Sequence, residues 1–90
     1  MTIANRTLAN ARSLADEFDA RAVALADIGH VLPEADIVVA CTASPVPVLT
    51  RADVATALKA RRRKPMLVLD LGVPRDVEAG VADLDDAYLY

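Results

Sequence analysis

The apolar positions of this chain fall into short continuous runs, separated by stretches in which they recur every three or four residues. The run at residues 66–69 is bounded by Pro65 and Gly72, which is typical of a strand buried on both faces of a parallel sheet. A second run, at residues 37–42, has the same form. Shorter runs at residues 2–4, 21–25 and 87–90 predict three further strands.

Helical spacing predicts two longer helices between these strands. The first covers residues 8–18, with Thr7 as its N-cap. Its expected apolar face consists of Leu8, Ala11, Ala15 and Phe18. The second begins after Thr50, where Asp53 completes a capping box, and ends in the basic residues 61–64 before Pro65. Leu49 and Val54 are placed as a hydrophobic staple around its first turn.

Two shorter segments complete the expected order of elements. Asp27 is a candidate N-cap for one or two helical turns ending at Pro33, and residues 76–84 form a short helix or a loop. Strands therefore alternate with helices along the whole chain. This alternation predicts an α/β fold, a Rossmann-like and mostly parallel sheet with flanking helices.

Composition narrows the class of protein. Ninety residues form at most one small domain, and a chain with one Phe and no Trp must fill its core with small aliphatic side chains. We expect a cytoplasmic protein, since no apolar run approaches the roughly 18 residues that span a membrane. One cysteine and one histidine predict neither an internal disulfide nor a metal site. A net charge of −3 argues against non-specific binding of nucleic acid.

Candidate binding residues lie where the predicted strands end. Asn5, Arg6 and Thr7 follow the first strand, at the place where a dinucleotide fold meets the adenosine ribose, and an Arg there can pair with the extra phosphate of NADP. Thr7 and the helix amino end would add hydrogen-bond donors to that phosphate. The alternative is a solvated Arg beside a capping Thr.

Polar residues also follow the strands at residues 37–42 and 66–69. Thr42 and Ser44 are candidates for the ribose or phosphates of a cofactor, and a local turn before Pro45 explains them equally well. Asp70 and Arg75 form either an ion pair that holds their loop or part of the nicotinamide site.

Three other residues or runs have structural interpretations. Cys41 is expected to be a buried, inert thiol, because no His or Lys lies nearby in the sequence. The basic residues 61–64 are expected to complement the helix dipole rather than to bind RNA. His30 is expected to be solvated on the short helix.

These segments together resemble the NADPH-binding domain of glutamyl-tRNA reductase. The resemblance rests on residues 3–7, on residues 35–44, and above all on Val73-Pro74-Arg75-Asp76 within residues 69–77. Shikimate dehydrogenases share the Asn-Arg-Thr turn but not this last segment, and members of the reductase family usually have Ala in place of Gly72. An NADP-binding domain of a shikimate-type dehydrogenase and a non-catalytic α/β interaction module are the alternatives.

The resemblance implies a role for a larger enzyme. Glutamyl-tRNA reductase uses NADPH to reduce glutamyl-tRNA to glutamate-1-semialdehyde in tetrapyrrole (porphyrin and haem) biosynthesis. The family forms homodimers and has glutamate-1-semialdehyde aminomutase as a possible partner. Its catalytic cysteine and its dimerisation helices belong to other domains, so residues 1–90 are expected to be inactive alone and to contribute no catalytic residue.

The dinucleotide fingerprint itself is missing from the sequence. Gly29, Gly72 and Gly80 do not form the Gly-rich turn that follows the first strand of a dinucleotide-binding fold. We therefore expect a partial NADP-binding domain that starts at the second strand and lacks the first βα unit. Two strand edges would then be unpaired, which predicts self-association of the isolated chain.

Overall fold

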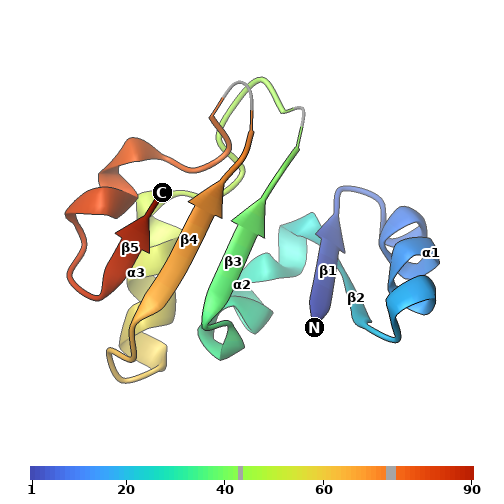
Figure 1. Cartoon of the computed structure of the whole chain (residues 1–90), viewed down its shortest axis with the longest axis horizontal. Helices are drawn as coiled ribbons and strands as arrows, with labels where there is room; N and C mark the ends of the chain where they lie inside the picture. Colours follow the sequence, from blue (N-terminus) through green and yellow to red (C-terminus); the bar gives the residue numbers. More distant parts are fainter. Residues whose placement is uncertain (43, 73–74) are drawn as a thin grey trace. The chain divides into compact units, whose positions relative to one another are not determined.

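The computed structural model describes residues 1–42, 44–72 and 75–90 and divides the chain into two compact units, Met1–Leu32 and Pro33–Tyr90. The elements follow the predicted order (Figure 1). Most strands begin and end within one residue of their expected ends, and the short helical segment expected within residues 76–84 is a 3-10 helix over Ala79–Asp83. The strand after Asp36 is the main exception, because it ends at Ala40 rather than at Thr42.

The first unit is a parallel strand pair with its crossover helix. Strand β1 (Thr2–Asn5) pairs with β2 (Arg21–Ala24), and helix α1 (Leu8–Phe18) connects them and contacts both. A 3-10 turn (Leu25–Asp27) and the short helix α2 (Ile28–Val31) follow. Ala11 and Ala15 are fully buried, since their small side chains let the helix lie close to the strands. Phe18, predicted to share this face, is 60% exposed on the last turn.

The second unit is a three-stranded parallel sheet in the order β3-β4-β5. Strand β3 (Ile37–Ala40) pairs with β4 (Met66–Asp70), which pairs with β5 (Ala87–Leu89). Helix α3 (Arg51–Ala60) connects β3 to β4 and lies behind the sheet in Figure 1. The 3-10 segments Leu32–Glu34 and Ala79–Asp83 precede β3 and β5.

The core of the second unit lies between α3 and one face of the sheet. Val54 and Leu58 of α3 are completely buried, as are Met66 and Val68 at alternate positions of β4. The predicted capping box is confirmed, because Asp53 N donates to Thr50 Oγ1 and Thr50 N donates to Asp53 Oδ2, each at 3.1 Å.

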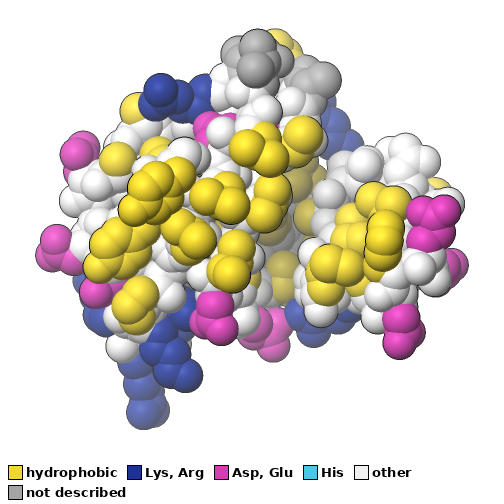
Figure 2. All heavy atoms as spheres, in the orientation of Figure 1, with side chains coloured by type: hydrophobic (Ala, Val, Ile, Leu, Met, Phe, Trp, Pro, Cys, Tyr) yellow, Lys and Arg dark blue, Asp and Glu magenta, His cyan; other side chains and the backbone are white. Residues whose placement is uncertain are grey.

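The other face of this sheet is apolar and open, so the prediction that β4 is buried on both faces is wrong. Leu67 and Leu69 are only half-buried, because strand residues alternate between faces and α3 covers one of them. Four neighbouring side chains are more than half exposed. Ile37 and Val39 belong to β3, Tyr88 belongs to β5, and Tyr90 follows β5. Figure 2 shows apolar side chains gathered over these strands.

The strand pairing leaves open edges, as the sequence predicts. Within the described residues, β1 has a strand partner on one side only, β2, and β3 likewise has only β4. In the same part of the chain, no helix is both long and apolar enough to cross a bilayer.

Candidate functional site

The loop after β3 and the loop after β4 are joined through the buried carboxylate of Asp76. Its Oδ2 accepts a hydrogen bond from Thr42 N at 2.6 Å, and its Oδ1 accepts one from Thr42 Oγ1 at 2.5 Å. Asp76 is 0% exposed, so these bonds replace the water that the carboxylate loses on folding. Its main-chain carbonyl also accepts from Val48 N and Leu49 N, at 2.7 and 3.1 Å.

Asp70, the last residue of β4, organises the loop that carries Asp76. Its carboxylate accepts from the main-chain N–H groups of Gly72, Asp76 and Val77, at 3.0, 3.2 and 2.9 Å. Burial alone would raise the pKa of Asp70. The N–H donors of Val77, Gly72 and Asp76 and the charge of Arg75 outweigh this effect, so its pKa lies below the ordinary value of 3.8.

The contacts of Asp70 exclude one of the two roles that the sequence left open, a structural ion pair with Arg75. The two described side chains Asp70 and Arg75 form no ion pair, because the Asp70 oxygens are directed at main-chain amides within the loop. Arg75 instead lies exposed and acts on Asp70 through its charge. A structural ion pair is therefore not what places Arg75 here.

A hollow of about 390 Å³ lies at the carboxyl ends of β4 and β5. Its lining consists of Asp70, Gly72, Arg75, Leu89 and Tyr90. The carboxyl ends of parallel strands are where open α/β sheets bind ligands. Asp70 and Arg75 therefore line the same hollow, and their role in cofactor binding stays a prediction.

Gly72 is needed for space rather than for backbone conformation. A Cβ atom at this position would clash with the Asp76 carboxylate, and no described glycine has a positive φ. An Ala at this position is therefore not a neutral exchange in this chain. It would require the buried Asp76 carboxylate to move.

Ser44 adopts the local turn that the sequence left as its alternative. Its Oγ donates to Val46 O at 2.7 Å, its N donates to Thr42 Oγ1 at 3.2 Å, and only 3% of the residue is exposed. Thr42 and Ser44 therefore shape the loop after β3. Ala43, Val73 and Pro74, which belong to the resemblance, lie outside the described residues.

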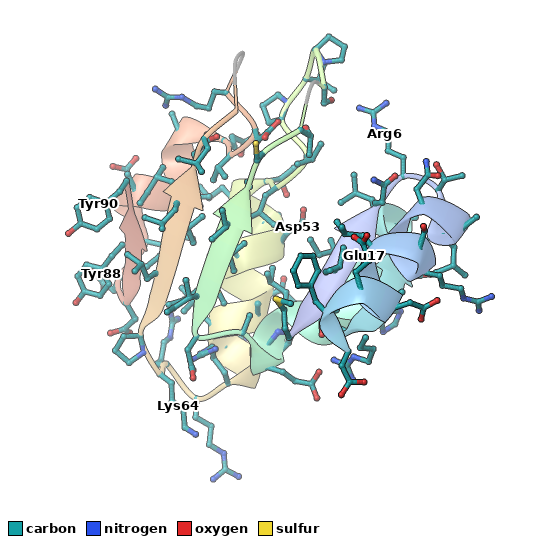
Figure 3. The ribbon with its side chains drawn as sticks, turned by 45° about the vertical axis from the view of Figure 1, so that its right-hand side comes forward. Arg6, Glu17, Asp53, Lys64, Tyr88 and Tyr90 are labelled. Atoms are coloured by element: carbon teal, nitrogen blue, oxygen red, sulfur yellow. The ribbon has the colours of Figure 1, made fainter. Side chains whose placement is uncertain are left out.

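Asn5, Arg6 and Thr7 form the connection from β1 to α1 in the first unit, and all three are exposed. Thr7 N donates to Asn5 Oδ1 at 3.1 Å. Thr7 occupies the N-cap position, but the prediction that its side chain caps α1 is wrong, because Thr7 Oγ1 accepts from Asn10 Nδ2 instead. Arg6 extends outward from this turn (Figure 3).

Other polar residues are placed differently from their predictions. Cys41 is exposed rather than buried, because β3 ends one residue before it. His30 is exposed, as expected. Among the described residues, no group of three or more His, Cys, Asp and Glu side chains is arranged to hold a metal ion.

The residue that sequence reasoning missed is Asp76. In the sequence it follows Arg75 directly, but its hydrogen-bond partner Thr42 lies 34 positions away. The sequence offers no pattern for that pairing, since it depends on how the ends of β3 and β4 meet. Its position in a polar cluster after a buried strand was the available indication.

Parallel strands, crossover helices and a polar site at the strand ends define an α/β protein of the Rossmann-like class. The chain belongs to the Shikimate / quinate 5-dehydrogenase family, whose model matches residues 1–90. The predicted resemblance to glutamyl-tRNA reductase is confirmed, because the chain is 57% identical to that enzyme from Shewanella oneidensis over all 90 residues. It spans 22% of the length of this relative.

Two solved structures agree with this classification. Glutamyl-tRNA reductase from Methanopyrus kandleri is 39% identical and matches with a TM-score of 0.91, over 98% of this chain and 22% of that one. The nucleotide binding domain of the Thermoplasma volcanium enzyme matches 98% of this chain and 55% of that one, with a TM-score of 0.70 and 22% identity. The second match bears on the fold alone and supports the predicted α/β, Rossmann-like class.

Proposed function

We propose that residues 1–90 form part of the NADPH-binding domain of a glutamyl-tRNA reductase. The observation that carries the proposal is the match at 57% identity, which covers all 90 residues and therefore both sets of candidate binding residues. In this proposal the segment contributes the cofactor-binding fold from the second strand onward. The catalytic and dimerisation domains are separate parts of the enzyme.

Asn5, Arg6 and Thr7 are proposed to bind the adenosine end of the cofactor. The exposed Arg6 guanidinium suits the 2′-phosphate that distinguishes NADPH from NADH. Asn5 holds the turn through its bond to Thr7 N. Because the Thr7 hydroxyl makes no cap bond to α1, it is not committed to the main chain of the first helical turn.

The loops of the second unit are proposed to serve the rest of the cofactor. Asp70 and Arg75 line the hollow at the strand ends, where a nicotinamide ribose and its ring would lie. Thr42 and Ser44 hold the shape of the adjoining loop through their mutual hydrogen bond. NADPH supplies the hydride when bound, and these residues bind and orient it.

The whole enzyme, in this proposal, acts in the cytoplasm on glutamyl-tRNA and yields glutamate-1-semialdehyde for tetrapyrrole synthesis. A homodimer and transfer of the aldehyde to an aminomutase complete the proposal. A shikimate-type dehydrogenase is the second candidate, because the family model carries that name.

A chimera tests the proposal. Residues 1–90 replace the matching segment of the Shewanella oneidensis reductase, and NADPH and NADH are titrated by nicotinamide fluorescence. We expect a preference for NADPH that Arg6→Ala abolishes and that Arg12→Ala, an exposed control on α1, leaves intact. Equal affinity for both cofactors, or a preference unaffected by Arg6→Ala, would overturn the assignment of Arg6.

The same chimera separates the two candidate reactions. With glutamyl-tRNA and NADPH it should form glutamate-1-semialdehyde, while shikimate and NADP⁺ should give no reduced cofactor. Turnover of shikimate without turnover of glutamyl-tRNA would favour the second candidate.

A further inference from the structure

The Asp76 side chain is buried, and its carboxylate contacts neighbouring residues rather than solvent. Three polar or charged residues are buried in the described part of the chain, and Asp76 is the carboxylate among them. Both of its oxygens face Thr42. A carboxylate without exposure cannot itself contact a cofactor in solution, so its effect must pass through the groups that it holds.

The contact with Asp76 uses both hydrogen-bond donors of Thr42. Its N–H and its hydroxyl proton both go to Asp76, and its Oγ1 accepts from Ser44 N at 3.2 Å. The Thr42 hydroxyl therefore has no proton to donate to a ligand. Asp76 therefore holds Thr42, and Thr42 in turn holds Ser44.

Asp76 is itself held by described residues that follow β4 and by the last residue of that strand. Asp70 holds Asp76 N, and Gly72 leaves the space that the Asp76 carboxylate occupies. Arg75 immediately precedes Asp76 and lines the hollow with Asp70. One buried group thus joins the two loops that follow neighbouring strands, at the edge where ligands bind in this class of fold.

We infer that Asp76 is a positioning residue for the cofactor site, which sets the geometry of the loop after β3 and of Arg75 without touching the cofactor. The inference rests on the proposed function. It predicts that Asp76 matters for the nicotinamide half of NADPH, which the second unit serves. The adenosine half, assigned to Arg6 in the first unit, should be insensitive to it.

Asp76→Asn in the chimera is the decisive variant. An amide is close to a carboxylate in shape, but it presents an N–H₂ donor where both Thr42 groups also donate. We expect NADPH to bind about tenfold more weakly, the size of one lost hydrogen bond to a charged group. Adenosine 2′,5′-bisphosphate, which is the adenosine half alone, should bind as before.

Two further variants separate positioning from loss of fold. Thr42→Ser keeps both donors and should retain NADPH affinity, whereas Thr42→Val removes the hydroxyl and should resemble Asp76→Asn. Asp83→Asn makes the same chemical change at an exposed position and should have no effect. Amide hydrogen exchange of Thr42 should show protection that Asp76→Asn removes.

Each outcome has one meaning. If NADPH and the bisphosphate weaken together in Asp76→Asn, or neither weakens, the positioning role is wrong. Unprotected Thr42 in the parent chimera also overturns it, whatever the cofactor affinity. If the parent chimera protects Thr42 but binds neither ligand, the proposed function fails and this inference falls with it. Loss of bisphosphate binding in Arg6→Ala alone supports the proposed function separately.

Discussion

Arg61 donates from its guanidinium to Asp36 Oδ1 at 2.5 Å, yet the two side chains differ sharply in burial, with 4% of Arg61 and 83% of Asp36 exposed. The same guanidinium donates to the carbonyls of four residues, Pro33, Ala35, Lys64 and Pro65. These carbonyls belong to the segments that lead into β3 and β4. Arg61 therefore holds the amino ends of two neighbouring strands, while its ion pair is largely solvated.

This arrangement predicts unequal effects of its two partners. Arg61→Lys should destabilise the chain by about 2 kcal/mol, because one ammonium cannot replace a planar fork of donors and loses several of the hydrogen bonds to these carbonyls. Asp36→Asn should cost less than about 1 kcal/mol, as exposed ion pairs do. Urea denaturation measures both, with the exposed Arg62→Lys as control. Equal losses would mean that the ion pair, not the carbonyl set, is what matters.

Two threonines in N-cap positions provide a matched pair. Thr50→Ala should reduce the free energy of unfolding by about 1 kcal/mol, because it removes the acceptor for Asp53 N. Thr7→Ala should have little effect, since the Thr7 side chain caps no main-chain group of α1. Thermal and urea unfolding of the two variants compare them directly. A larger loss in Thr7→Ala would contradict the observed hydrogen bonds.

Asp70 should make stability depend on pH in the acid range. Its pKa is lowered in the folded state, so the unfolded chain binds more protons at pH values between the two pKa values. Its contribution is therefore complete above the unfolded value of about 4 and is lost as the pH falls through the folded value. Asp70→Asn should be less stable at neutral pH and should show a flatter acid limb in denaturation curves measured across pH.

The control for this effect is Asp83→Asn, at an exposed position of the same unit. It should keep the acid limb of the parent chain. An unchanged limb in Asp70→Asn would show that other carboxylates cause the acid sensitivity.

The local features of the fold are readable from sequence, whereas its long-range contacts are not. The capping box at Thr50 and Asp53 depends on residues three apart, and both side chains make the expected bonds. Thr7 has the same position at α1, but Asn10 competes for its hydroxyl, so residue preference alone misassigned its bond. Asp76 with Thr42, and Arg61 with the carbonyls before β3, join segments far apart in the chain. No local pattern encodes those pairs.

The burial of β4 shows a second limit of sequence patterns. A continuous apolar run correctly predicts a central parallel strand, and β4 does lie between β3 and β5. A continuous apolar run predicts that both faces of the strand are buried, but it does not specify which element covers each face. Met66 and Val68 have α3 over them, while Leu67 and Leu69 share an open face with Val39 and Tyr88.

That open face predicts self-association of the 90-residue chain. Ile37 and Val39 are 62% and 58% exposed, and Tyr88 and Tyr90 project from the β5 side of the same sheet (Figure 3). Burying such apolar surface against a second copy is favourable, and β3, which among the described residues has a strand partner on one side only, offers its other edge for pairing. Analytical ultracentrifugation should show concentration-dependent association.

A single charge on this face should weaken the association. In Val39→Lys the ammonium must be desolvated if two faces meet, so the monomer fraction should rise at a given concentration. Phe18→Lys adds the same charge at an equally exposed apolar residue, 60%, on α1 in the other unit, and should leave the association unchanged. Equal effects of both variants would point to net charge rather than to this face. A parent chain that sediments as a monomer at all concentrations would mean that the exposed strands tolerate water without a partner.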